Sequence, residues 1–439
     1  MSLPIYPAYR DSGTEWLGAV PAQWEVKRLK FVLRLLTNKT DRRSNPVALE
    51  NIESWSGKLI PSETVFEGDG VAFARGDILF GKLRPYLAKV YLADSEGEAV
   101  GDFHVLRPLE TVVARFAQYQ MLSSAFITVV DGSTFGSKMP RASWEYVANM
   151  PFVVPSREEQ EQIAAFLDRE TGKIDSLINE QEKLLTLLAE KRQVTISHAV
   201  TRGLNSDSPM KDSGVAWLGE VPAHWEVKQL RHIAKIVRGA SPRPAGDPVF
   251  FASDNDDGEN MPWVTVAEVT KDGLTYLTEV SEYLTPAGVK NSQAFKAGTL
   301  VFTNSGATLG VPKVLSIDCC ANDGILAFND LSKEVKIRFL YAFLSTTTER
   351  LRTEMKQGGG QPNLNTGIVK NITFVLPPFV EQAAIVSFLE TEAAKLDALR
   401  AEAQRAIYLL KERRSALIAA AVTGKIDVRE KAAALEQAA

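Results

Sequence analysis

Two segments of this chain occur twice in the same order, and this duplication constrains the fold more than any other feature. Residues 11–29, DSGTEWLGAVPAQWEVKRL, match residues 212–230, DSGVAWLGEVPAHWEVKQL, at 14 of 19 positions with an offset of 201. Residues 149–204 match residues 371–426 over 56 positions without a gap, at an offset of 222 and with 22 identities. Because an internal repeat decides the architecture, the chain is a tandem duplication. The repeated frame surrounds two inserts of different sequence, residues 30–148 and 231–370.

Length and composition predict an ordinary globular protein of several domains. A chain of 439 residues is too long for one hydrophobic core, and its 45% hydrophobic and 24% charged residues are typical of soluble proteins. No apolar run is long enough to span a membrane, and the N-terminus MSLPIYPAYR lacks an apolar signal core, so we expect a cytoplasmic location and no membrane. The adjacent Cys319 and Cys320 are expected to be buried free thiols.

The charge distribution neither supports nor excludes nucleic-acid binding. Net charge is −4, and the two inserts are neutral, with 14 basic and 14 acidic side chains in the first and 15 of each in the second. A DNA-binding face would therefore have to arise by clustering basic groups on one side of an insert.

Short apolar runs bounded by Gly, Pro, Asp and Asn predict that each insert is a mixed domain with more strand than helix. The strand candidates are Gly76–Gly81, Ala88–Leu92, Gly298–Thr303, Val311–Ile317 and Gly324–Phe328. The helix candidates are Val113–Val130 and Ile337–Lys356, followed by the loops Asp131–Pro140 and Gln357–Pro362. The repeated opener, with Trp16 and Trp24 or Trp217 and Trp225 around a Gly-x-Val-Pro turn, is expected to be an ordered, non-helical segment that packs its tryptophans on the domain.

The second repeated segment predicts a long amphipathic helix in each copy, with Gly172 as a possible kink in the first. About 40 residues make a rod of roughly 60 Å, and an exposed apolar stripe of that length needs a partner. The other copy is the simplest one, packed antiparallel. The stripes are Ile163, Phe166, Leu167, Ile174, Leu177, Leu184 and Leu188, and Ile385, Phe388, Leu389, Leu396, Leu399, Leu409 and Leu410.

These patterns predict an α+β fold in which two strand-rich globular domains are separated by two long antiparallel, coiled-coil-like helices with a pseudo-twofold internal repeat. The predicted boundaries are 1–155 for the first domain, 156–204 for the first helix, 205–377 for the second domain, 378–426 for the second helix and 427–439 for a tail.

No catalytic or metal site is predicted, although several motifs come near one. Gly76–Leu83 has phosphate-loop spacing, but Leu83 replaces the metal-binding hydroxyl. Leu376–Phe379 resembles the end of an adenine methyltransferase motif without its Asn or Asp, and the four histidines lack paired ligand spacing. Two alternatives stay open. One is a stand-alone Mg²⁺-dependent nuclease that uses Glu25 and Lys27, with Asp11 and the repeated copies Asp212, Glu226 and Lys228. The other is an adaptor that binds only proteins.

Several motifs together resemble the DNA specificity subunits of type I restriction-modification systems. They are the opener D-S-G-x-x-W-L-G-x-V-P-x-x-W-E-V, the segments Pro155–Asp175 and Pro377–Asp397, the Gly-Asp-Ile-Leu-Phe-Gly strand, the turn 305–310 and Gly-Gly-Gly-Gln-Pro-Asn-Leu-Asn at 358–365. The resemblance covers nearly the whole chain. It implies that each insert is a target recognition domain that reads one half of a bipartite, asymmetric site in double-stranded DNA.

The resemblance also implies the partners and the division of labour. The helices would fix the gap between the half-sites and dock two modification (methyltransferase) subunits, and two restriction (translocase and nuclease) subunits would complete the ATP-dependent nuclease. This chain would itself be non-catalytic and hold no cofactor, while S-adenosylmethionine, ATP and Mg²⁺ would act in the partner subunits. The segment 133–142, STFGSKMPRA, keeps only part of the Gly-x-Pro-Asn-Leu pattern, so the site roles in the first insert follow the resemblance less closely.

The candidate DNA-binding residues are donors and acceptors beside glycine or proline in turns, because such side chains read base edges or fix phosphates. They are Lys82, Arg84, Lys138 and Arg141 in the first insert, and Asn304, Ser305, Thr308, Lys356, Gln361, Asn363 and Asn365 in the second. The candidate partner-binding residues lie on the apolar faces of the long helices: Leu184, Leu188, Leu409 and Leu410.

Overall fold

The computed structural model describes residues 4–42, 44–60, 69–136, 138–255, 258–306, 308–353 and 363–429. The chain divides into two compact units. Unit 1 comprises Met1–Lys183 and Ala403–Ala439, and unit 2 comprises Leu184–Glu402. Each unit therefore holds one insert together with a part of each long helix.

Unit 1 is built on two four-stranded sheets. The first has the order β4-β11-β8-β9 and is antiparallel throughout, and the second has the order β5-β7-β10-β6, in which β10 and β6 are parallel. The strands are β4 (Leu33–Leu36), β5 (Lys39–Thr40), β6 (Pro46–Val47), β7 (Gly70–Phe73), β8 (Ile78–Gly81), β9 (Val90–Leu92), β10 (Gly97–Val100) and β11 (Phe103–Pro108). All four residues of β8 are buried, because this strand has neighbours on both sides and packs into cores on both faces.

Helices cover the first sheet of unit 1 and form its main core. They are α1 (Ala114–Leu122), α2 (Ser124–Gly132) and α3 (Trp144–Asn149), with short 3₁₀ turns at Leu29–Phe31, Leu49–Asn51 and Pro85–Leu87. Phe116 of α1 and Phe126 of α2 share one cluster with Phe80 of β8, and the rings of Phe80 and Phe126 meet edge-on at 6.1 Å. The single helix predicted over Val113–Val130 is two helices, because Ser123 leaves the helical conformation and caps α2 through a hydrogen bond from Phe126 N.

Unit 2 repeats this plan with larger sheets. Their orders are β16-β25-β22-β23-β19 and β17-β20-β18-β24-β21. The strands are β16 (Lys235–Arg238), β17 (Phe251–Ala252), β18 (Met261–Val264), β19 (Tyr276–Leu277), β20 (Glu282–Leu284), β21 (Gln293–Phe295), β22 (Leu300–Thr303), β23 (Pro312–Leu315), β24 (Cys319–Ala321) and β25 (Ile325–Asn329). The helices of the insert are α5 (Val266–Thr270), α6 (Pro286–Lys290), α7 (Ile337–Thr353) and α8 (Thr366–Lys370), with a 3₁₀ turn at Leu230–His232. Phe339 and Phe343 of α7 pack edge-on against Phe374 in the main core.

The repeated opener forms the same small structure in each unit. A hairpin is followed by a strand that pairs with the last strand before the long helix. In unit 1 these are β1 (Tyr9–Asp11) with β2 (Ala19–Pro21), and β3 (Glu25–Arg28) with β12 (Pro151–Val154). In unit 2 they are β13 (Met210–Asp212) with β14 (Glu220–Pro222), and β15 (Glu226–Gln229) with β26 (Thr373–Leu376). The second tryptophan of each opener is buried, Trp24 at 1% and Trp225 at 0% exposure.

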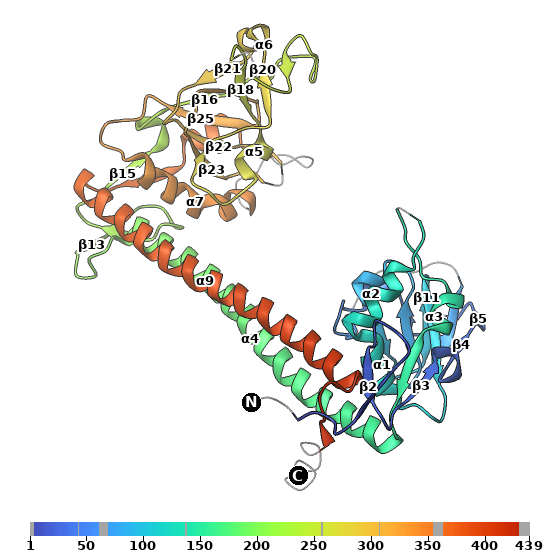
Figure 1. Ribbon diagram of the computed structural model, residues 1–439. Coiled ribbons are helices and arrows are strands. Elements are labelled where there is room, and N and C mark those ends of the chain that lie inside the picture. Colours follow the sequence, from blue (N-terminus) through green and yellow to red (C-terminus); the bar gives the residue numbers. More distant parts are fainter. Residues whose placement is uncertain are drawn as a thin grey trace. The chain divides into compact units, whose positions relative to one another are not determined.

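The two long helices are α4 (Arg157–Arg202) and α9 (Phe379–Val422), coloured green and orange-red in Figure 1. In unit 1 Asp175 of α4 meets Arg414 of α9, whereas in unit 2 Arg192 of α4 meets Asp397 of α9. A later residue on α4 thus pairs with an earlier residue on α9, so the two helices run antiparallel. The predicted fold class is confirmed, and α4 continues through Gly172 without interruption.

Half of the 14 predicted stripe residues are buried, two are half-buried and five are exposed. The exposed five are Leu177, Leu184, Phe388, Leu399 and Leu409, at 46%, 38%, 38%, 46% and 54%. Both cysteines are buried free thiols. Burial raises the pKa of Cys319 to about 12 and also raises the pKa of Cys320. Within the described residues, no helix has the length and apolar character needed to cross a membrane.

Candidate nucleic-acid interface

The described candidate DNA-binding residues lie in or beside two loop pairs that occupy equivalent places in the two units. In unit 1 the chain leaves β8 and residue Leu83 forms a bridge with Arg141. In unit 2 the chain leaves β22 and Ser305 forms a bridge with Asn363. Leu83 and Ser305 are 222 positions apart, as are Arg141 and Asn363, which is the offset of the sequence repeat. The inserts thus keep the frame of the repeat at these loops although their sequences differ.

Backbone hydrogen bonds hold both loop pairs in the same way. Ala142 N donates to Lys82 O at 2.9 Å, and its counterpart Leu364 N donates to Asn304 O at 2.7 Å. Lys82 N donates to Asp102 O, and Asn304 N donates to Gly324 O, both at 2.9 Å. Because the scaffold is set by the backbone, its side chains are free to differ between the two units.

The loop pair of unit 1 is basic. Arg84 and Lys138 are exposed, and Arg84 is anchored through its backbone N–H, which donates to Pro140 O at 2.8 Å. Arg84 has a φ of +50°, so it stands in the left-handed region at the head of a short 3₁₀ turn. Within the described part of the chain, neither side chain has a hydrogen bond or ion pair, so both are available to phosphate or base oxygens.

Asp102 holds the other two basic residues of this loop pair. Arg141 donates to its two oxygens from Nε at 3.0 Å and from Nη2 at 2.9 Å, a bidentate geometry. Lys82 Nζ lies 3.7 Å from Asp102 Oδ1. The hydrogen bond from Arg141, and then its charge and that of Lys82, lower the pKa of Asp102. Asp102 was not predicted from the sequence, because it lies 39 residues from Arg141 and no motif surrounds it.

A buried histidine supports the same loop from beneath. His104 Nε2 lies 3.1 Å from Ala142 O, and burial lowers the pKa of His104. The neutral ring can therefore donate to this carbonyl while its face packs beside Trp144, with ring centroids 5.7 Å apart. His104 is thus a packed side chain, and it also fixes the residue that follows Arg141.

The loop pair of unit 2 is polar and uncharged. Ser305 is half-buried, whereas Thr308 and Asn363 are exposed. Thr303 closes the loop, since its Oγ1 donates to Thr308 O at 2.8 Å and accepts from Val311 N at 2.9 Å. Asn365 is exposed and caps α8, because its side chain accepts a hydrogen bond from Ile368 N at 2.8 Å.

Asn304 lies inside the protein and not on this surface. It is 1% exposed, and its Nδ2 donates to Leu364 O at 3.4 Å. In this position Asn304 ties the two halves of the loop pair together and presents no donor outward. Lys356 and Gln361, also predicted to contact DNA, lie outside the described residues.

The candidate partner-binding leucines differ in exposure. Leu184 is 38% and Leu409 is 54% exposed, Leu410 is half-buried, and Leu188 is only 8% exposed. Leu188 therefore seals the helix pair, whereas Leu184 and Leu409 offer apolar surface. Sequence reasoning missed further exposed apolar residues on the same helices: Leu187 and Val194 of α4, and Val380 and Tyr408 of α9.

The residues of the nuclease alternative form ordinary structural contacts. Glu25 and Lys27 pair with each other at 2.5 Å, and Glu226 pairs with Lys228 at 2.7 Å. The aspartates of the openers accept from the backbone two residues on, Asp11 from Gly13 N and Asp212 from Gly214 N, which stabilises turns. Among the described residues, no three His, Cys, Asp or Glu side chains gather closely enough to hold a metal ion.

Comparison with known proteins agrees with this architecture. Residues 222–406 match the type I restriction modification DNA specificity domain. The chain is 22% identical over 443 residues to the type I restriction enzyme MjaIX specificity subunit of Methanocaldococcus jannaschii, a match that covers 94% of this chain and 96% of the relative.

Two solved structures share the fold. One is a chain from a type I R-M system whose complex assembly and conformational transition were studied. It has a TM-score of 0.71 at 18% identity, covering 92% of this chain and 98% of that one. The HsdS subunit from Thermoanaerobacter tengcongensis has a TM-score of 0.52 at 19% identity, with the same coverages. The chain therefore carries a type I restriction modification DNA specificity domain over residues 222–406, and over nearly its whole length it is similar to type I restriction enzyme specificity subunits.

Proposed function

We propose that this chain reads a bipartite, asymmetric site in double-stranded DNA, with one half-site read by each insert. The observation that carries the proposal is the pair of equivalent loop pairs, 82–84 with 140–142 and 304–306 with 363–365, held by the same backbone bonds. One presents Lys82, Arg84 and Arg141, and the other presents Ser305 and Asn363. The same backbone arrangement with different side chains would allow the two inserts to read two different half-sites.

The two surfaces suit different bases. Arginine and lysine donate to the O6 and N7 acceptors of guanine, whereas asparagine pairs in a bidentate way with adenine. Arg141 is oriented by two bonds to Asp102, which reduces the freedom that it would lose on binding a base. Arg84 and Lys138 are exposed, and long cationic side chains of this kind serve best as phosphate contacts that fix the register of the protein on the duplex.

In this proposal the chain is non-catalytic and needs no cofactor of its own. Two modification subunits would dock on the apolar surface of the long helices that includes Leu184 and Leu409, one at each copy of the repeat. Two restriction subunits would join that complex. S-adenosylmethionine, ATP and Mg²⁺ would be bound by these partners. The antiparallel helices would set the gap between the half-sites, because their length is fixed by backbone hydrogen bonds.

The experiment that tests the proposal is a methylome comparison. Adenine methylation is mapped across the genome in cells that express this chain with its methyltransferase, and in cells that express the methyltransferase alone. The proposal predicts methylation at one bipartite motif that appears only with this chain. Random methylation, or none when the complex is shown to be assembled, would contradict it.

A matched pair of variants links the result to the two loop pairs. Arg141→Ala should relax or abolish recognition of one half-site while the other half-site stays unchanged, and Asn363→Ala should do the reverse. Each variant is the control for the other, because the two residues hold equivalent positions. Loss of both half-sites in each variant would indicate a folding defect or a different reading surface.

A further inference from the structure

The repeat places the same group of side chains beside the helix pair in each unit. In unit 1 Asp175 of α4 pairs with Arg414 of α9, and Asp168 of α4 pairs with Arg115 of α1. At the repeat offset of 222, Asp175 corresponds to Asp397, Asp168 to Glu390 and Arg414 to Arg192. Arg338 of α7 pairs with Glu390 at 3.0 Å, as Arg115 pairs with Asp168 in unit 1. We refer to this group as the helix corner: Asp168, Asp175, Arg115 and Arg414 in unit 1, and Glu390, Asp397, Arg338 and Arg192 in unit 2.

In unit 1 a segment of the insert, residues 55–58, lies across the helix corner. Lys58 Nζ reaches Asp175 Oδ2 at 2.7 Å, and Arg414 Nη1 donates to Trp55 O at 2.8 Å. The carbonyl of Val90 would lie 2.3 Å from a Cβ at Gly57, whose φ is +69°, so only glycine permits this course of the chain. As a result, the side chains of Asp175 and Arg414 are only 17% and 11% exposed.

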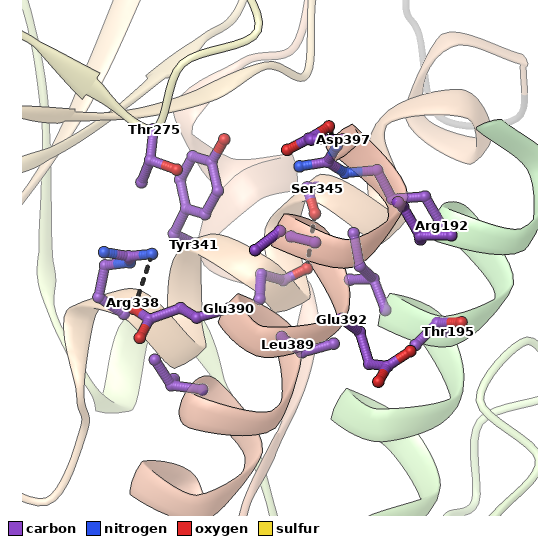
Figure 2. A pocket seen from close by; sticks show the side chains of 16 residues that line it. Arg192, Thr195, Thr275, Arg338, Tyr341, Ser345, Leu389, Glu390, Glu392 and Asp397 are labelled. Carbon is purple, nitrogen blue, oxygen red and sulfur yellow. Dashed lines mark hydrogen bonds and ion pairs between the residues drawn. The ribbon is translucent and has the colours of Figure 1, made fainter. Parts of the chain in front are cut away.

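In unit 2 the helix corner is open. A cavity of about 330 Å³ lies there, between the helix pair and α7, and Figure 2 shows Arg192, Asp397, Arg338 and Glu390 around it. A smaller cavity of about 280 Å³ remains at the corner of unit 1, where residues 56–58 form part of its wall. The two corners therefore differ in the exposure of their ion pairs more than in cavity volume. Asp397 and Arg192 pair at 2.5 Å but are 54% and 41% exposed. No segment among the described residues of unit 2 reaches them as Trp55 and Lys58 reach their counterparts in unit 1. The apolar part of the wall is formed by Ile196, Tyr341, Val386, Leu389 and Leu396.

We propose that the open corner of unit 2 is a docking site for an extended, lysine-bearing segment of another protein. Its lysine ammonium binds Asp397, and its backbone carbonyl accepts from Arg192, as Lys58 and Trp55 O do in unit 1. Charge favours this ligand, because three carboxylates and two guanidinium groups line the cavity: Glu390, Glu392, Asp397, Arg192 and Arg338. The volume is at the lower end of the range for specific ligand pockets. This inference does not depend on DNA reading.

The segment that contacts the ion pair of the corner in unit 1 supplies the probe. A synthetic peptide with the sequence of residues 53–58, Glu-Ser-Trp-Ser-Gly-Lys, is given a terminal thiol and offered to the full-length chain carrying Ala394→Cys. Ala394 is exposed and lines the cavity. Disulfide capture under a fixed ratio of oxidised to reduced thiol then reports weak binding. The native Cys319 and Cys320 are buried and do not compete.

The repeat also supplies the matched control. Gly172 is the counterpart of Ala394 and lines the cavity in unit 1, where the segment 55–58 already pairs with Asp175 and Arg414. A Cβ at Gly172 meets nothing within 4 Å, so Gly172→Cys should fold. We expect capture at Ala394→Cys to exceed capture at Gly172→Cys several-fold. Capture at Ala394→Cys should fall about tenfold when the lysine of the peptide is replaced by alanine, because one charge-assisted hydrogen bond is lost. The same fall is expected when Asp397→Asn is added to the Ala394→Cys chain.

Equal capture at the two cysteines would overturn the proposal, as would capture that ignores the peptide lysine and Asp397. Thermal unfolding of the Ala394→Cys and Asp397→Asn chains distinguishes a lost site from a lost fold. Asp397 belongs to an exposed ion pair, so both chains should unfold at nearly the temperature of the parent.

Discussion

Arg414 of α9 donates from its Nε to Oδ1 of Asp175 on α4, at 2.9 Å. The repeat produces the same pair a second time with the helices exchanged, since Arg192 of α4 donates to Asp397 of α9. Each copy of the repeat therefore contributes the acid of one pair and the base of the other. Such an exchange arises only when the helices are antiparallel and aligned about a local twofold relation. The two ion pairs thus show which residues of α4 lie opposite which residues of α9.

The first prediction concerns the stability of unit 1. Asp175→Asn removes the carboxylate that pairs with Arg414, whose side chain is 11% exposed, and with Lys58, whose side chain is half exposed. Because an uncompensated buried charge is costly, we expect the free energy of unfolding of this unit to fall by roughly 2–3 kcal/mol. Urea denaturation followed by tryptophan fluorescence measures the change.

The matched control for this prediction is Asp397→Asn. Its side chain and that of Arg192 are half exposed, so water can solvate the arginine that remains, and the loss should stay below about 1 kcal/mol. A similar loss of unfolding free energy in Asp175→Asn and Asp397→Asn would show that burial by the segment 55–58 does not strengthen the ion pair between Asp175 and Arg414.

The second prediction concerns phosphate contacts of the first insert. Arg84→Ala and Lys138→Ala should each weaken binding to specific and random duplexes alike and reduce the slope of log K against log salt by about 1. Titration of a labelled duplex at several salt concentrations, with the assembled complex, measures both quantities.

Arg75→Ala is the control for those two variants. Arg75 is also exposed, but it precedes the start of β8 whereas Lys82 follows its end. The slope should therefore remain that of the parent protein. A reduced slope for Arg75→Ala would move the DNA-binding surface to the opposite end of this strand.

The third prediction separates affinity from specificity. Asp102→Asn removes a negative charge beside Lys82 and Arg141 and replaces the bidentate acceptor of Arg141. We expect binding to random DNA to become tighter, because one more cation is free to meet phosphate. Discrimination between correct and altered half-sites should fall, because Arg141 loses its fixed orientation. Competition between specific and random duplexes measures the ratio, and an unchanged ratio would exclude a positioning role for Asp102.

The fourth prediction concerns the pH range of the same contact. Arg141 lowers the pKa of Asp102 below the ordinary value of an aspartate, so the folded state favours the ionised carboxyl. The stabilisation is therefore fully present above the ordinary aspartate pKa and is lost as pH falls through the lowered one. A carboxyl NMR titration of Asp102 in the parent and in Arg141→Ala should show the higher pKa in the variant. Equal values would mean that the ion pair does not form in solution.

Part of this fold was evident from the sequence because repetition and periodicity are local properties. The tandem repeat and the 3.6-residue stripes predicted the long helices and their antiparallel pairing, and turn residues around apolar runs located strands such as β8 and β22. The repeat offset also aligned Pro140 with Pro362, close to the bridges that close the two loop pairs.

Other features depend on contacts between distant residues, and no local pattern reports them. Asn304 stands in a polar turn sequence, yet it is buried because Leu364 folds over it from 60 residues away. The carboxylate of Asp102, directly before β11, meets Arg141, which lies 39 residues along the chain. The open helix corner of unit 2 is visible only by comparison with the segment 55–58 in unit 1, since the repeat gives both corners the same Asp–Arg pair.

The last prediction tests whether the helix pair sets the gap between half-sites. Deleting residues 184–190 of α4 together with 399–405 of α9 removes seven residues from each helix. Both deletions lie between the two ion pairs, since 184–190 falls between Asp175 and Arg192 and 399–405 falls between Asp397 and Arg414. Seven residues shorten a helix by about 10 Å and turn it through nearly two full turns, so its faces stay in phase. At about 3.4 Å per base pair, the preferred gap should shorten by about three base pairs. Methylome mapping of the deletion variant reads the gap directly, and a motif with unchanged spacing would show that the helices do not act as the ruler.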